Sequence, residues 1–163
     1  MADVWFVDSN IWLYALVADS RHLGKTKTAA SIAVPGCVVS TQVVNEVTRN
    51  LKIKALFDEE RIRRIIDGFY QDCHVVAPDK TLLLSASKLR ERYQLSYWDS
   101  HIVAAALSAN ATLLFSEDMQ NGMRIEDQLT IVNPFEKLVE KSMSSSSVRV
   151  RFAPSPTGYL HVG

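Results

Sequence analysis

Residues 4–10 (VWFVDSN) are the segment that most constrains the fold of this chain. Residues of high β-propensity end abruptly at Asp8, which is followed by Ser9 and Asn10. A short apolar run bounded by small polar residues is typical of a fully buried strand. Open α/β sheets place their ligand crevice at the carboxyl ends of the strands. Asp8 is therefore predicted to lie at such a crevice.

The remainder of the chain alternates helix-like and strand-like patterns, which predicts a parallel sheet covered by helices on both faces. Further strands are predicted at residues 37–39, 73–77, 112–115 and 129–132. Helices are predicted at residues 11–17, 25–33, 42–55, 79–93 and 96–109, and another is predicted to open at Asp58. Ser40 or Thr41 can cap the helix 42–55, because their hydroxyls accept from free backbone N–H groups.

Composition favours a globular intracellular protein. The chain has 163 residues, of which 47% are hydrophobic and 22% charged, and this suits a domain with a real core. No apolar run approaches the ~18 residues of a membrane span, and the start lacks the basic region of a secretory signal. Cys37 and Cys73 are expected to be buried thiols of a reducing cytoplasm rather than a disulfide or zinc site. The net charge of zero does not by itself indicate a nucleic-acid-binding protein.

Three further acids occupy comparable ends of predicted elements: Glu46, Asp99 and Asp118. Each of the four acids also has a purely structural interpretation. Asp8 could cap the following helix, and the helix dipole favours an acid at Glu46. Asp99 completes a Ser-x-x-Asp capping box, whereas Asp118 could be a solvated loop acid. Alternation along the strand predicts that only one of Glu117 and Asp118 faces the crevice, and Asp118 is the expected one.

Taken together, the four acids predict a metal site. They lie at the ends of two strands and the starts of two helices, all on one rim of the predicted sheet. Such a cluster repels itself unless hard cations lie within it. Ligand sets of oxygen atoms without His or Cys favour Mg²⁺ or Mn²⁺. One or two such ions can activate water and stabilise a phosphodiester transition state.

The chain resembles the PIN domain, and within it the VapC-type toxin ribonucleases. The resemblance covers nearly all of residues 1–135 in order and spacing. Four stretches carry it: residues 7–14 (VDSNIWLY), 40–47 (STQVVNEV), 95–106 (LSYWDSHIVAAA) and 114–122 (LFSEDMQNG).

This resemblance implies a metal-dependent endoribonuclease that acts as the toxin of a toxin–antitoxin pair. The implied fold is a three-layer α/β/α arrangement with a five-stranded parallel sheet, often dimeric. The implied partners are RNA, a cognate antitoxin and a second copy of the chain. Mg²⁺ or Mn²⁺ would be held by an acidic quartet, with two supporting polar residues: Asp8, Glu46, Asp99 and Asp118, supported by Asn10 and Ser116.

Two other functions compete with the ribonuclease. The same fold could bind RNA or protein without catalysis, although the four intact carboxylates favour an enzyme. A phosphatase-like domain could use Asp8 as a covalent nucleophile, as in proteins resembling the haloacid dehalogenases. Those enzymes require Asp-x-Asp after the strand, and the third position here is Asn10.

The composition changes after Lys141. Residues 142–147 (SMSSSS) are linker-like. Residues 148–163 (VRVRFAPSPTGYLHVG) resemble the opening of a glutamyl-tRNA synthetase and stop inside its nucleotide-binding motif. A strand and half a motif cannot bind ATP without the rest of a nucleotide fold. The predicted organisation is a nuclease domain at 1–141 and a dispensable tail at 142–163.

Overall fold

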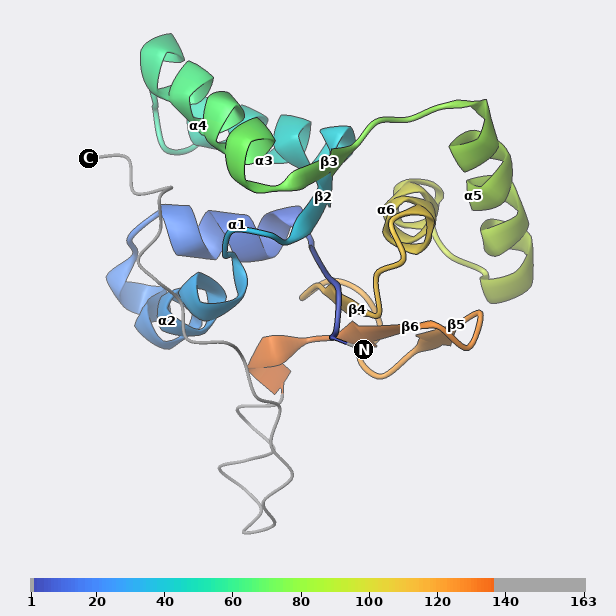
Figure 1. The fold of residues 1–163 in the computed structure, drawn as a ribbon. Helices are drawn as coiled ribbons and strands as arrows, with labels where there is room; N and C mark the ends of the chain where they lie inside the picture. Colours follow the sequence, from blue (N-terminus) through green and yellow to red (C-terminus); the bar gives the residue numbers. More distant parts are fainter. Residues whose placement is uncertain (1, 137–163) are drawn as a thin grey trace, which may run out of the picture.

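The computed structural model describes residues 2–136 and contains one mainly parallel sheet (Figure 1). Its strands in chain order are β1 (Trp5–Val7), β2 (Val38–Ser40), β3 (His74–Val76), β4 (Leu113–Phe115), β5 (Arg124–Ile125) and β6 (Leu129–Val132). Their spatial order is β3-β2-β1-β4-β6-β5. The neighbours from β3 through β6 pair in parallel, and β5 pairs antiparallel with β6.

The predicted α/β fold with five parallel strands is confirmed, and the short strand β5 is an addition. β5 and β6 are joined by a tight turn in which Glu126 and Asp127 have φ of 53° and 52°. Gly, Asn and Asp are the residues that usually signal such left-handed turn positions. Asp127 fits this signal but Glu126 does not, and β5 has only two residues, so the sequence did not predict this hairpin.

The helices form where the periodicity predicts them, with ends shifted by a few residues. They are α1 (Ser9–Leu16), α2 (Leu23–Ile32), α3 (Thr41–Ile53), α4 (Glu59–Asp72), α5 (Lys80–Tyr93) and α6 (Tyr97–Ser108). A short 3₁₀ helix, η1 (Ser20–His22), occupies the polar break before α2. Side-chain caps set several starts: Ser40 accepts from the Val43 N–H, and Asp58 accepts from the Arg61 N–H.

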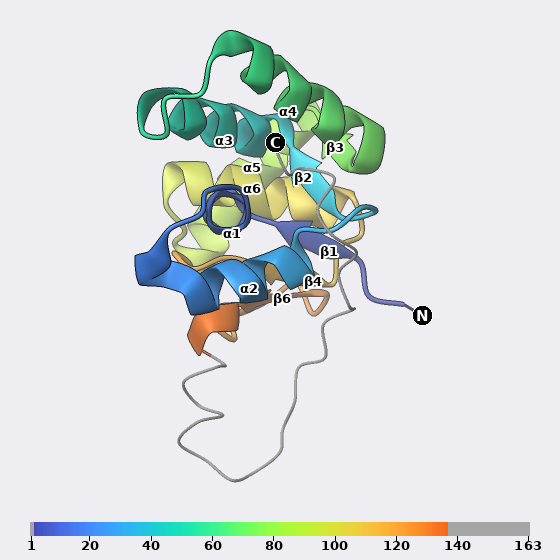
Figure 2. The same ribbon diagram turned by 90° about the vertical axis from the view of Figure 1, so that its left-hand side faces the viewer.

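The helices cover both faces of the sheet. Figure 1 shows α5 and α6 on one side of β1 and β4, with α1 and α2 on the other. Figure 2 shows α3 and α4 lying together beside β2 and β3. The chain passes from β1 outward to β2 and β3 and then returns to β4 on the far side of β1. The strand order therefore reverses between β1 and β4, which is the place where α/β sheets form a ligand crevice at the strand ends.

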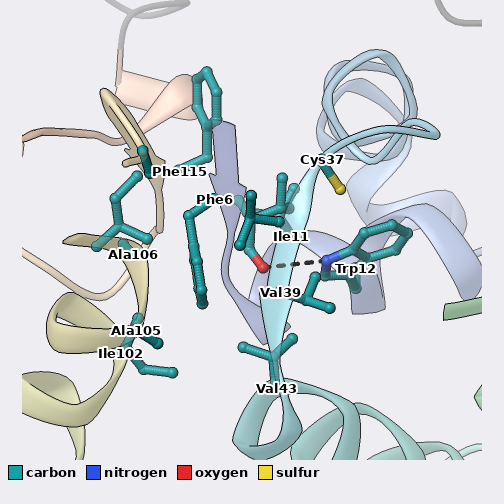
Figure 3. Packing of buried hydrophobic residues seen from close by; sticks show 14 of the residues in the cluster. Phe6, Ile11, Trp12, Cys37, Val39, Val43, Ile102, Ala105, Ala106 and Phe115 are labelled. Carbon is teal, nitrogen blue, oxygen red and sulfur yellow. Dashed lines mark hydrogen bonds between the residues drawn. The ribbon is translucent and has the colours of Figure 1, made fainter. Parts of the chain in front are cut away.

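Large buried side chains hold β1 and α1 in place (Figure 3). Phe6 is fully buried and faces Ala105 and Ala106 of α6. Trp12 is fully buried on the other side, where its ring meets Phe69 at a centroid distance of 4.8 Å. The indole N–H of Trp12 also donates to the Val7 carbonyl at 3.2 Å. This packing fixes the strand end that carries Asp8.

Three further predictions concern the cysteines, membrane-spanning segments and the domain boundary. The sulfur atoms of Cys37 and Cys73 lie 3.8 Å apart, so no disulfide joins them, and Cys37 is buried as predicted whereas Cys73 is only partly buried. No helix among the described residues is long and apolar enough to cross a membrane. The predicted domain boundary at Lys141 and the tail at 142–163 lie outside the described residues.

Candidate active site

Asp8 lies at the end of β1, where its backbone N–H donates to the Phe115 carbonyl of β4 at 3.0 Å. The side chain is buried, with only 6% of the residue exposed. One carboxylate oxygen accepts from the Ser9 N–H at 2.7 Å, which caps α1. The other accepts from the Ser116 hydroxyl at 2.8 Å. Asp8 therefore caps α1, as the sequence allowed. Its second carboxylate oxygen faces Ser116 at the end of β4.

Asn10 and Ser116 connect Asp8 to Asp118. The Asn10 amide donates to Asp8 at 3.4 Å and to Asp118 at 3.1 Å. Its carbonyl oxygen accepts from the Glu117 N–H at 3.1 Å. The hydroxyl of Ser116, which is fully buried, also accepts from the Asp118 N–H at 3.3 Å. These bonds join the ends of β1 and β4 side chain to side chain.

Glu46 reaches the same place from the second turn of α3. One of its carboxylate oxygens accepts from the Ser9 hydroxyl at 3.0 Å, and the other from the Gln42 amide at 2.9 Å. Two neutral donors, Ser9 and Gln42, thus satisfy its carboxylate in this structure. Gln42 precedes Glu46 by one helical turn, so the i, i+4 spacing could have revealed it.

The two adjacent acids after β4 have different surroundings. Glu117 accepts from the Tyr14 hydroxyl at 2.8 Å and forms an ion pair with Lys25. Asp118 is exposed and accepts from Asn10. The structure thus ties Glu117 to α1 and α2 and leaves Asp118 beside the other acids, as the sequence predicted.

The environment of Asp8 disfavours its negative charge. Burial raises the pKa of Asp8 from an ordinary 3.8 to about 6, and repulsion from Glu46 and Asp99 contributes in the same direction. Hydrogen bonds from Ser116 and Ser9 oppose this rise. A carboxylate that is desolvated and faces other acids gains from a bound cation.

Asp99, in the first turn of α6, is also affected by burial and by neighbouring acids. Burial raises its pKa, and repulsion from Asp118 and Glu46 adds to the effect, whereas the bond to the cap Ser96 lowers it. Asp99 therefore interacts electrostatically with Glu46 and Asp118, and Asp8 does so with Glu46 and Asp99. The structure brings all four predicted acids into one electrostatic cluster, which we call the acid cluster.

The donor atoms of the acid cluster fit a hard divalent cation. They are carboxylate oxygens, supplemented by the oxygens of Asn10 and Ser116, without nitrogen or sulfur ligands. Among residues 2–136, no three acidic, histidine or cysteine side chains form a preassembled metal site. In this arrangement the N–H and O–H donors of Asn10, Ser116 and Ser9 provide the positive partial charge that the carboxylates require.

A pH-dependent stability follows for the metal-free protein. The pKa of Asp8 is higher in the folded than in the unfolded chain, so between about pH 4 and about pH 6 only the folded chain holds this proton. Asp8 therefore makes the free energy of unfolding decrease as pH rises through this range, by about 3 kcal/mol in total. In urea unfolding with EDTA present, the free energy of unfolding of Asp8→Asn relative to that of the wild type should increase from pH 4 to pH 7. A pH-independent difference between the two proteins would contradict this assignment.

Comparison with known families supplies one extensive match and one short one. The family described as PIN domain matches residues 5–120. The catalytic domain of class I tRNA synthetases for Glu and Gln matches only residues 147–163. No curated protein matches the chain significantly.

Three solved structures share the fold at low sequence identity. A toxin–antitoxin complex from Klebsiella pneumoniae has 19% identity and a TM-score of 0.58, covering 81% of this chain and 98% of its own. The VapC20 toxin of Mycobacterium tuberculosis, which cleaves the sarcin–ricin loop, has 19% identity and a TM-score of 0.54, covering 70% and 91%. VapBC2 from Rickettsia felis, bound to promoter DNA, has 17% identity and a TM-score of 0.53, covering 80% and 99%.

Proposed function

Since the chain belongs to the PIN domain family, we propose that it is a metal-dependent endoribonuclease and the toxin of a toxin–antitoxin pair. The observation that carries this proposal is the acid cluster at the switch point between β1 and β4. Asp8 and Ser116 meet there across neighbouring strands, and Glu46 and Asp99 are near enough to raise the pKa of Asp8. The VapC20 toxin, which shares the fold, cleaves RNA according to its description.

In this proposal the acid cluster holds Mg²⁺ or Mn²⁺. The ion would stabilise the negative charges of Asp8 and Asp99 most, because burial and the neighbouring acids disfavour those charges. The bound ion supplies Lewis-acid activation of water and charge stabilisation at the phosphodiester. Asn10 orients the carboxylates of Asp8 and Asp118 because its amide donates to both, and Ser116 orients Asp8 by donating to it directly. Glu46 completes the cluster from α3, held in place by Ser9 and Gln42.

The proposed partners are an RNA substrate, a cognate antitoxin and a second copy of the chain, all in the cytoplasm. Two of the similar structures are described as toxin–antitoxin assemblies, which supports the antitoxin. An antitoxin that presents a basic side chain would suit a cluster of carboxylates, because a cation relieves their repulsion.

Metal removal tests this proposal directly. The purified protein should cleave single-stranded RNA in buffer with Mn²⁺ or Mg²⁺, and an excess of EDTA should abolish the cleavage. Restoring the ion should restore the rate, because hydrogen bonds between protein groups hold Asp8 and Asp118 in position. Equal cleavage in EDTA and in Mn²⁺ would refute the metal mechanism.

A non-catalytic binding module is the second candidate, favoured by the lack of a preassembled metal site among the described residues. RNA binding with no cleavage under any divalent ion would establish it. A covalent role for Asp8 has less support. Both oxygens of this buried carboxylate accept hydrogen bonds, from Ser9 and Ser116, which lowers its availability as a nucleophile. A phosphoenzyme trapped on Asp8 would reverse that conclusion.

A further inference from the structure

A cavity of about 640 Å³ adjoins the acid cluster between α3, α5 and α6. Glu46 belongs to both, because its side chain joins the cluster and also lines the cavity. We call this space the Trp98 cavity. Its other walls include Gln42 and Asn45 of α3, apolar side chains near the start of α5, and Tyr97, Trp98 and His101 of α6. This volume lies within the range of small-molecule sites.

Trp98 presents a large aromatic surface at this cavity. The residue is 62% exposed although it is apolar, and it directly precedes Asp99 of the acid cluster. Its backbone carbonyl accepts from the Gln42 amide at 3.4 Å, and Gln42 also donates to Glu46. Trp98 is therefore tied through one amide to a carboxylate of the candidate active site.

The neighbouring rings hold Trp98 and leave it as the available stacking surface. Tyr97 meets Trp98 edge to face at 5.0 Å, and the Arg90 guanidinium covers the Tyr97 ring at 4.4 Å. His101 lies tilted against both aromatic rings, at 4.8 Å from Tyr97 and 5.3 Å from Trp98. A ring positioned by such neighbours loses little freedom when a flat ligand stacks on it.

The polar groups of the Trp98 cavity suit a neutral heterocycle. His101 Nδ1 lies 2.8 Å from the Tyr97 carbonyl, which can only accept, so Nδ1 carries the hydrogen. Nε2 is the second polar atom of this ring. Gln42 and Asn45 add amide groups that can donate and accept. Glu46 is the sole charged residue lining the cavity as the structure describes it, so a phosphate is disfavoured there.

We propose that the Trp98 cavity binds an unpaired base of the RNA substrate, stacked on Trp98 beside the phosphodiester held at the acid cluster. The inference rests on the proposed ribonuclease function and adds the class of substrate feature that the enzyme reads. Proteins recognise unpaired RNA bases by stacking them on aromatic rings and bonding their edges. The RNA would place a base against Trp98 and an adjacent backbone phosphate towards Asp99.

Tryptophan fluorescence tests the stacking step without any need for catalysis. AMP, GMP, CMP and UMP are titrated separately into the protein in EDTA, with ribose 5-phosphate as a probe that has no base. At least one nucleotide should quench the fluorescence saturably, and ribose 5-phosphate should not. Trp5 and Trp12 both remain in Trp98→Phe, so the loss of quenching in this variant assigns the signal to Trp98. Equal quenching by ribose 5-phosphate, or saturable quenching that survives in Trp98→Phe, would overturn the proposal.

RNA cleavage tests the connection to the acid cluster. Trp98→Ala should raise KM for single-stranded RNA by about 10-fold, because stacking of one base contributes an effect of this order. Trp98→Phe should recover most of that loss. The matched control is Tyr70→Ala, which removes a similarly exposed aromatic residue from α4 and should leave KM unchanged.

The outcomes separate the two proposals. Metal-dependent cleavage with an unchanged KM in Trp98→Ala overturns the base-binding cavity and retains the nuclease. If the wild type cleaves no RNA, the nuclease proposal fails, and with it the placement of the base beside a scissile phosphate. Size-exclusion chromatography covers a third case. Conversion of a dimer to a monomer by Trp98→Ala, with no nucleotide quenching, shows that a second copy covers the cavity and overturns the inference.

Discussion

Replacing Asp8 with Asn is expected to reduce kcat/KM for RNA cleavage by at least about 100-fold, since even residues behind metal ligands contribute 10- to 100-fold. Asn keeps the size of the side chain and an oxygen that can accept from the Ser9 N–H. It removes the charge that faces Glu46 and Asp99. The loss should therefore arise from weaker metal binding and not from unfolding. Initial rates of RNA cleavage over a Mn²⁺ titration measure both effects.

Asp67→Asn is the matched control for this substitution. Asp67 is exposed on α4 and outside the acid cluster, so the same change of side chain there should leave the cleavage rate unaltered. Urea unfolding of Asp8→Asn should show stability equal to or above that of the wild type at pH 7, because a buried, repelled charge has been removed. A wild-type cleavage rate in Asp8→Asn would exclude Asp8 from the catalytic site.

Replacing Trp12 with Ala is expected to destabilise the protein by about 3–5 kcal/mol, the range for removing a large aromatic ring from a core. The indole is fully buried and packs on Phe69 at 4.8 Å, and its N–H donates to the Val7 carbonyl. The Ala variant loses the ring and leaves that carbonyl without its partner. The midpoint and slope of urea unfolding measure the change.

Trp12→Phe separates the two contributions. Phe keeps an aromatic contact to Phe69 but cannot donate to Val7, so its destabilisation should be smaller, about 1–3 kcal/mol. Val7 directly precedes Asp8. Both variants should therefore also lower the rate of RNA cleavage at temperatures where the carboxyl end of β1 begins to unfold. A Trp12→Ala protein within about 1 kcal/mol of the wild type would contradict the packing argument.

Local patterns in the sequence determined the elements and the starts of several helices. Alternation of apolar runs with helical periodicity predicted all five parallel strands, because burial on both faces of a sheet leaves a continuous apolar run. Ser40, Asp58 and Ser96 mark helix starts in the sequence and cap those helices in the structure. The prediction of Asp8 as a strand-end acid depended on the same kind of local change from apolar to polar residues.

Only the tertiary structure decided which side chains meet. The strand order β3-β2-β1-β4-β6-β5 places Ser116 against Asp8 across 108 residues of sequence. It also lets Ser9 donate to Glu46, and ties Glu117 to Lys25 while Asp118 stays beside Asn10. Periodicity reports the environment of each segment but carries no information about its neighbours in space. Those neighbours follow from the return of the chain to the far side of β1, which closes the site between β1 and β4.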